Sequence, residues 1–179
     1  MIHRLLSSLP RVLMLGLTPG LFLVGAAGAH PAYADTVNSI INANGKCLTE
    51  ENAAPKIMID ICDTTSRQDW NIIPDQSGNF LIQNQLTHDC VTSDGTSRGS
   101  AVIAQSCGAL GSNPLQVWHE VDQVTEHGFT FHELVNPVFP LLSQDLAMHP
   151  SGCGAANDLP IFVNAQFECD ADNWRLPGS

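Results

Sequence analysis

One stretch of the sequence, residues 47–70, reads CLTEENAAPKIMIDICDTTSRQDW, and its order of two cysteines followed by a tryptophan occurs twice more along the chain. In each copy the second cysteine comes 15 to 17 residues after the first, and the tryptophan follows soon after. The pattern uses every cysteine and tryptophan of the protein: Cys47, Cys62 and Trp70; Cys90, Cys107 and Trp118; Cys153, Cys169 and Trp174. A threefold internal repeat predicts a fold assembled from three similar units.

The first 34 residues have the features of a secretory signal peptide. Arg4 and Arg11 give a positive start, residues 12–27 form an almost uncharged apolar run, and small residues end the segment at Ala34. The run is interrupted by glycine and proline and is shorter than the ~20 residues that a membrane-spanning helix needs. We therefore expect cleavage near Ala34, a mature domain over residues 35–179, and a secreted protein, extracellular or in the cell envelope, without membrane insertion.

An exported chain meets an oxidising environment, where an even number of cysteines at regular spacings indicates a disulfide framework. Six cysteines allow 15 pairings, and the repeat favours pairing within each unit. Each such bridge would stabilise the fold by about 3 kcal/mol. The pairs expected on this basis are Cys47–Cys62, Cys90–Cys107 and Cys153–Cys169. A zinc site would need thiolates two to four residues apart, and the spacing offers none, so we expect no metal.

Short β-favouring runs, such as residues 56–61 and 160–163, alternate with turn sequences such as Asn44-Gly45. The mature chain has no apolar helical stripe longer than two turns, which indicates an all-β class. A propeller needs at least four blades of this length, whereas three units can close around a pseudo-threefold axis. The expected fold is a β-trefoil of three four-strand units, over about residues 37–78, 79–126 and 127–178.

The balance of charge limits the partners. Loss of the signal peptide removes two of the seven basic residues and none of the 18 acidic ones, which leaves a mature charge of −13. An acidic surface repels nucleic acid and anionic lipid, but it does not oppose neutral sugars or basic proteins. The expected partners are therefore a glycan or glycoprotein, or a secreted protein, and not nucleic acid.

Two tripeptides, Gln68-Asp69-Trp70 and Gln116-Val117-Trp118, are copies of a Gln-x-Trp signature. They follow the cysteine stretches Gly45-Lys46-Cys47-Leu48 and His88-Asp89-Cys90-Val91, and the third unit keeps the tryptophan but reads Asp172-Asn173-Trp174. These residues resemble the ricin B-chain type of β-trefoil lectin over about residues 37–178. The resemblance implies a trefoil fold and carbohydrate binding.

The repeated glutamines and tryptophans are interpreted as structural. A large indole fills a core and needs a partner for its N–H, and a glutamine amide can bond backbone groups in a neighbouring turn. The residues expected to build the repeat core are Gln68, Trp70, Gln116, Trp118 and Trp174.

In the resembled family, each sugar pocket combines an aspartate two residues after the first cysteine, an aromatic ring two before the second, and an Asn-Gln pair leading into the tryptophan. The first unit has Thr49, Asp60 and Arg67 at the positions of the aspartate, the ring and the asparagine. The second unit has Thr92, Gln105 and Leu115 there, with Asp94 nearby as a substitute acceptor. The resemblance therefore implies that both pockets are lost.

The third unit has an aromatic residue, Phe167, two positions before Cys169. If Ser143 stands at the place of the first cysteine, then Asp145 is the acceptor, and Cys153 falls in an inserted loop, which leaves its pairing open. The candidate carbohydrate-binding residues are Asp145 and Phe167, with Asn164 and Asp172 as auxiliary polar contacts.

Histidines near the junction of the second and third units do not form a metal motif. His132-Glu133 begins like a helical zinc sequence, but Asn136 stands where a second histidine is required. We interpret this segment, with His119 and His127, as an exposed, hydrated loop.

Motifs for catalysis are also absent from the sequence. It has no Gly-x-Ser-x-Gly elbow, no phosphate-cradling glycine loop and no single cysteine left over for a nucleophile. Paired carboxylates for glycoside hydrolysis stay open, because 18 acidic residues offer many pairs. We expect a protein that is not an enzyme and has no cofactor.

The sequence thus predicts a secreted, lectin-like β-trefoil whose sugar binding is limited to the third unit. Two alternatives stay open: a protein-interaction or toxin-delivery subunit that has lost sugar binding, and an inhibitor of a secreted enzyme. Similar domains form cell-binding subunits of bacterial toxins such as the cytolethal distending toxins. The identity of the sugar or protein partner and the oligomeric state do not follow from the sequence.

Overall fold

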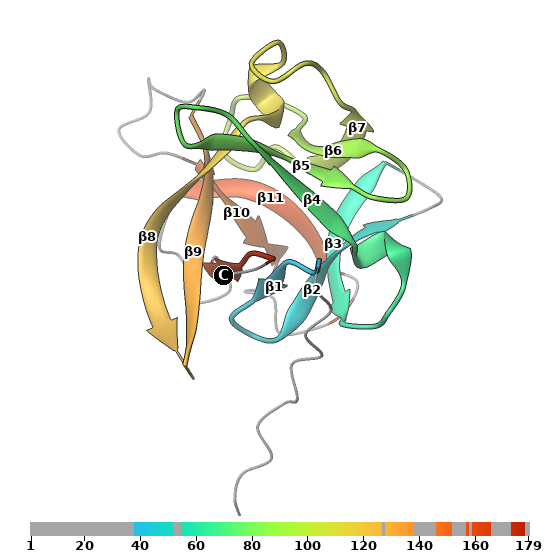
Figure 1. Cartoon of the computed structure of the whole chain (residues 1–179), viewed down its shortest axis with the longest axis vertical. Coiled ribbons are helices and arrows are strands. Elements are labelled where there is room, and N and C mark those ends of the chain that lie inside the picture. The colour runs from blue at the N-terminus through green and yellow to red at the C-terminus, as the bar shows by residue number, and fades with distance from the viewer. Residues whose placement is uncertain are drawn as a thin grey trace, which may run out of the picture. The chain divides into compact units, whose positions relative to one another are not determined.

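The protein is described from a computed structural model (Figure 1). The structure describes residues 38–51, 55–126, 128–137, 146–151, 157, 159–165 and 173–177. The chain divides into a unit of Met1–His30 and a unit of Pro31–Ser179, and the first unit and the expected cleavage site lie outside the described residues. In the part of the chain that is described, no helix has the length and apolarity to cross a membrane.

Strands make up most of the described chain, and two short 3-10 helices, η1 Ser66–Gln68 and η2 Pro114–Gln116, precede β4 and β8. The strands are β1 Ile41–Asn42, β2 Lys46–Glu51, β3 Lys56–Ile61, β4 Trp70–Pro74, β5 Asn79–Asn84, β6 Asp89–Ser93, β7 Val102–Ser106, β8 Trp118–Glu126, β9 Phe129–Asn136, β10 Leu146–Pro150, β11 Leu159–Ala165 and β12 Asn173–Arg175. Each successive group of four strands repeats the same pairing pattern, as the threefold sequence repeat predicts.

The first and last strands of the units form a closed barrel. Antiparallel ladders join β4 to β5, β5 to β8, β8 to β9, β9 to β12 and β12 to β1. The ring is completed where the Trp70 amide donates to the Asn38 carbonyl (3.0 Å), which links β4 to the segment before β1. A barrel closed in this way leaves no unpaired edge, which is one solution to the edge-strand problem of all-β folds.

The two middle strands of each unit form a hairpin, and the three hairpins β2–β3, β6–β7 and β10–β11 cap the barrel. The hairpins contact one another in a triangle: Lys56 pairs with Ile103, Met58 with Pro160, and Ala101 with Phe162. Barrel and cap together are a β-trefoil, so the predicted fold class is confirmed.

The core lies inside the barrel and beneath the cap. Trp70, Trp118 and Trp174 are at most 1% exposed and belong to one cluster with the inward-facing aliphatic residues of the hairpins. Each unit thus contributes one indole to a shared interior, which confirms the structural interpretation of these tryptophans. Burying three indoles at 150–250 Å² each supplies a large part of the apolar burial of a domain of this size.

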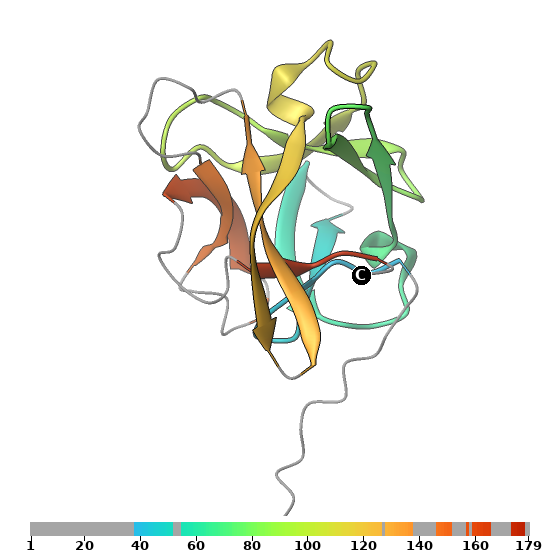
Figure 2. The same cartoon turned by 60° about the vertical axis from the view of Figure 1, so that its left-hand side comes forward.

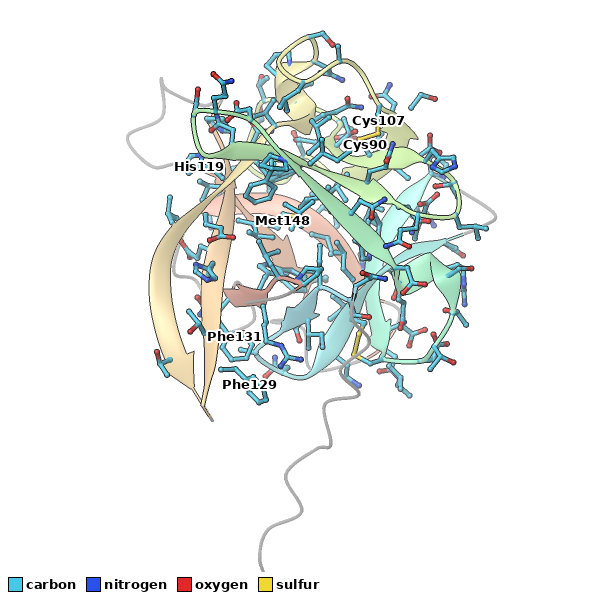
Figure 3. All side chains as sticks on the ribbon, viewed as in Figure 1. Cys90, Cys107, His119, Phe129, Phe131 and Met148 are labelled. Atoms are coloured by element: carbon cyan, nitrogen blue, oxygen red, sulfur yellow. A yellow bond between two sulfur atoms is a disulfide. The ribbon has the colours of Figure 1, made fainter. Side chains whose placement is uncertain are left out.

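The hairpin of β8 and β9 is longer than its counterpart in the preceding unit, with nine and eight residues against five in β4 and six in β5. Its two strands twist around each other along their length (Figure 2), with a bulge between Val121 and Gln123. Near the turn, the guanidinium of Arg175 lies over the ring of Phe129, 4.2 Å from its centroid; Figure 3 shows Phe129 at the start of β9. This cation–π contact fixes the end of the hairpin against β12.

Candidate functional site

Indole hydrogen bonds define which residues are equivalent in the three units. Trp70 Nε1 donates to the Leu48 carbonyl (2.9 Å), and Trp118 Nε1 donates to the Val91 carbonyl (2.9 Å). In the third unit Trp174 Nε1 donates to the Met148 carbonyl (3.2 Å). Leu48, Val91 and Met148 therefore occupy the same position, which sets the register of the third unit independently of its cysteines.

This register places Ala147 where the first two units have Cys47 and Cys90. The hairpin ladders agree, because Cys47 pairs with Asp60, Cys90 with Gln105, and Ala147 with Asn164. The structure thus differs from the alignment based on Ser143, which is four residues away from the equivalent position. The alignment followed the cysteines, but in the third unit neither framework position holds one.

Three consequences follow for the predicted sugar site. His149 occupies the position of the family's aspartate, Asn164 occupies that of the ring, and Gln166 corresponds in sequence to the second cysteine. Asp145, Phe167 and Asp172 lie outside the described residues, as do Cys153 and Cys169. Of the four candidate contacts, only Asn164 is described, as a residue of β11 paired with Ala147. Sugar contact by these residues stays a prediction.

The two framework disulfides of the first and second units are formed as predicted. Cys47 is joined to Cys62, and Cys90 to Cys107, the pair labelled in Figure 3. Each bond ties the start of the second strand of a unit to the residue just after its third strand. The disulfide Cys90–Cys107 also packs against Leu81, Val117 and Leu110 in a small apolar cluster outside the main core.

Gln68 and Gln116 act as identical clamps in their units. Gln68 Nε2 donates to Thr49 Oγ1 (2.9 Å) and to the Ile61 carbonyl (2.8 Å), while its Oε1 accepts from the Asp63 amide (2.8 Å). Gln116 makes the same contacts to Thr92, Ser106 and Gly108. Both glutamines are at most 1% exposed, so their amides hold the loop before each tryptophan against the hairpin.

The clamp also accounts for the two threonines at the aspartate positions. Thr49 and Thr92 are each 1% exposed, and each hydroxyl donates to the carbonyl of the preceding cysteine while accepting from the glutamine. The only proton of each hydroxyl is thus used, and burial keeps the remaining lone pair away from a sugar. At the ring position of the first unit, which pairs with Cys47, Asp60 is a carboxylate whose Oδ1 accepts from the Ile61 amide (2.7 Å). The aspartate position of the first unit therefore holds no carboxylate and its ring position holds no ring, as the sequence predicts.

A second repeated amide was missed from the sequence. Asn42, Asn84 and Asn136 end β1, β5 and β9, and each is 0% exposed. Asn84 Nδ2 donates to the Arg67 carbonyl (3.1 Å), and Asn136 Nδ2 donates to the Pro114 carbonyl (3.2 Å). Asn42 Oδ1 accepts from the Lys46 amide (2.9 Å). Each asparagine joins a barrel strand to a neighbouring connection, and the recurrence of Asn before each capping hairpin was the available signal.

One buried carboxylate lies between the first and second units. Glu50 is 5% exposed and accepts from Thr87 Oγ1 (2.8 Å). Burial is the largest cause that raises the pKa of Glu50, the hydroxyl of Thr87 opposes it, and the charge of Asp89 adds to it. In the second unit, Ser93 occupies the position equivalent to Glu50, so the second unit has no carboxylate there.

The histidine segment is not the exposed loop that the sequence suggested. Residues 118–126 and 129–136 are the paired strands β8 and β9, and His132 is 6% exposed, with Nδ1 3.2 Å from Glu120 Oε2. The pairing of β9 with β12 places His132 directly opposite Trp174 in the ladder. His127 lies outside the described residues. Among the residues that the structure describes, no group of three or more His, Cys, Asp or Glu side chains could hold a metal.

The sequence of the chain matches the family model of the ricin-type beta-trefoil lectin domain over residues 36–134, more than half of its length. The chain belongs to the ricin-type β-trefoil lectin family. The match covers the first two units and the start of the third. The third unit is the one whose structural register departs from the cysteine pattern. A comparison with curated proteins gave no match.

Solved structures of the ricin-type trefoil fold resemble the chain at low sequence identity. A designed threefold symmetric protein, ThreeFoil, is 18% identical with a TM-score of 0.67, covering 79% of this chain and 97% of that one. A ricin B-like lectin from Macrolepiota procera, solved with lactose, is 15% identical with a TM-score of 0.62, covering 76% and 91%. The cytolethal distending toxin of Haemophilus ducreyi is 15% identical with a TM-score of 0.59, covering 78% and 81%. These likenesses support the fold.

Proposed function

We propose that this protein is a secreted, non-catalytic carbohydrate-binding trefoil whose glycan contact is limited to the third unit. Membership in the ricin-type lectin family supports carbohydrate binding, and the similar trefoil from Macrolepiota procera was solved with lactose. The limitation to one unit comes from the state of the other two.

The observation that carries this proposal is the occupation of Thr49 and Thr92. Both hydroxyls are buried and bonded to the glutamine clamps, so the place from which a carboxylate would bind two sugar hydroxyls is closed in the first and second units. The third unit has neither framework cysteine and reads Asp172 in place of the clamp glutamine. The third unit therefore lacks the glutamine–threonine hydrogen bond that closes the aspartate position in the other two units.

The candidate contacts in the third unit are Asp145 and Phe167, with Asn164 and Asp172 as auxiliary polar groups. A carboxylate accepts bonds from two adjacent hydroxyls, a ring covers the apolar face of a pyranose, and an amide can donate and accept. A glycan array with the mature protein tests this assignment, together with the variants Asp145→Ala and Phe167→Ala. Binding by the wild type that both variants weaken supports the site, and a wild type that binds no glycan contradicts the proposal.

A second candidate function is a protein-interaction or toxin-delivery role. It is favoured by the closure of two of three pockets and by the likeness in fold to the cytolethal distending toxin. The acidic surface would suit a basic partner, whether a toxin component or a secreted enzyme that the trefoil inhibits. Pull-down from secreted material with the mature protein separates this function from the first, because a stable protein complex without glycan binding favours delivery or inhibition.

Secretion is tested by the mass of the protein recovered from the culture medium. Cleavage after Ala34 gives a chain that begins at Asp35 and carries the −13 charge. A recovered chain that still begins at Met1, or protein retained in the cytoplasm, contradicts the assignment.

A further inference from the structure

The outward face of the three capping hairpins carries one set of equivalent positions in each unit. Strand residues alternate between faces, and Ile59, Ala104 and Val163 are buried in the core at equivalent positions. The residues immediately before them, Met58, Ile103 and Phe162, therefore face outward. All three are half-buried, and they lie around the pseudo-threefold axis, where the hairpins meet.

These three residues are tied to the former pocket positions by the hairpin ladders. Met58 pairs with Thr49, and Ile103 pairs with Thr92, so each lies directly across from the position of the family's aspartate. In the third unit Phe162 pairs with His149 in the same register. A ring at Phe162 therefore lies beside the acceptor position, on the neighbouring strand and on the outward side.

The third unit differs from the others in what this face presents. Two residues before the outward apolar residue, the first unit has the exposed Lys56, the second has Ala101, and the third has the exposed Pro160. Pro160 and Phe162 give β11 an uncharged surface with one aromatic ring. The corresponding surface of the first unit carries Lys56 and Asp60, and that of the second unit carries no ring.

The three units differ in the residue that lies across the axis from this position. Met58 is bridged by Pro160 and Ile103 by Lys56, whereas Phe162 is bridged by Ala101, which has only a methyl group. Of the three equivalent side chains, the aromatic one therefore has the smallest cross-hairpin neighbour. A flat ring next to a small residue is a suitable support for the apolar face of a sugar.

From this arrangement we infer that Phe162, with Pro160 beside it, is the surface on which the third unit stacks a neutral terminal pyranoside, an inference that rests on the proposed lectin function. The structural register places Asn164, which has no ring, at the family's ring position. Phe162 would supply the missing stacking contact. Sialylated glycans are disfavoured, because β11 carries no basic residue and the chain has a net charge of −11. The ligand class is thus a neutral glycan that exposes one apolar ring face.

The test compares four single variants of the mature protein on matched neutral and sialylated glycans, with affinities measured by titration. Phe162→Leu keeps apolar volume and removes the ring, Phe162→Trp keeps a ring, and Met58→Ala and Ile103→Ala alter the equivalent positions that have none. Loss of a stacking contact of about 1.4 kcal/mol corresponds to about tenfold weaker binding. We expect that loss for Phe162→Leu, retained binding for Phe162→Trp, and changes below about twofold for the two control variants.

The possible results separate this inference from the function on which it rests. Wild-type binding that Phe162→Leu leaves unchanged, while Phe167→Ala weakens it, overturns the inference and keeps the lectin function. Tighter binding of the sialylated glycan overturns the ligand class. A wild type that binds neither glycan overturns both. Thermal unfolding of each variant shows that a loss of affinity is not a loss of fold.

Discussion

The glutamine clamp makes a quantitative prediction about stability. Replacing Gln68 with alanine removes three hydrogen bonds, to Thr49 Oγ1, the Ile61 carbonyl and the Asp63 amide, at a side chain that is 1% exposed. A hydrogen bond contributes about 1 kcal/mol net, and a buried group left without a partner costs about 1–3 kcal/mol. We therefore expect Gln68→Ala to lower the free energy of unfolding by about 2–4 kcal/mol.

Urea denaturation at neutral pH measures this effect, with Gln76→Ala, at an exposed turn residue, as the matched control. A double-mutant cycle with Thr49→Val isolates the amide–hydroxyl bond, and we expect a coupling energy of about 1 kcal/mol. A loss for Gln68→Ala no larger than that of the control, below about 0.5 kcal/mol, would refute the clamp. An additive cycle would show that Thr49 is not held by Gln68, and with it the closure of the first pocket would lose its basis.

The remaining predictions concern one turn and one carboxylate. His88 has φ of 62° at the position where the first unit has Gly45 with φ of 74°, and a left-handed conformation costs a side chain about 1 kcal/mol. His88→Gly should therefore raise the stability and Gly45→Ala should lower it. A lower melting temperature for His88→Gly, or an unchanged one for Gly45→Ala, would contradict this. For Glu50, the pKa is raised in the folded state above its usual value of 4.5, so its stabilising contribution is complete below the unfolded pKa and is lost as the pH rises through the folded pKa. Glu50→Gln keeps an acceptor for Thr87 and should be more stable than the wild type at pH 7, by a margin that shrinks toward pH 4, while Glu51→Gln serves as the control. A variant less stable than the wild type at pH 7 would count against burial as the main cause.

Much of the fold could be predicted because the residues that carry it recur at fixed intervals. Core indoles and framework cysteines need the same environment in each unit, so Trp70 and Trp118, with Cys47–Cys62 and Cys90–Cys107, lie where the repeat places them. The buried asparagines recur equally well, but a polar residue near a turn does not distinguish a buried amide from an exposed one without the structure.

The candidate site could be predicted less well, because the third unit has cysteines in different places. An alignment that follows Cys169 puts Phe167 at the ring position. In the structure, the hydrogen bond from the Trp174 indole to the Met148 carbonyl sets the register of β10, and the pairing of β10 with β11 then puts Asn164 at the ring position. Any residue can supply the backbone carbonyl that accepts from an indole, so the sequence does not show which residue does. The burial of His132 was missed for a related reason, since the length of β8 and β9 depends on pairing across the turn at Gly128.

The number of glycans bound per chain tests the central claim most directly. Isothermal titration of the mature wild-type protein with a glycan selected on the array gives this stoichiometry. With two pockets closed by the clamps at Thr49 and Thr92 and the third unit able to bind, we predict one glycan per chain. A stoichiometry of two or three, or no binding of any glycan, would contradict the account.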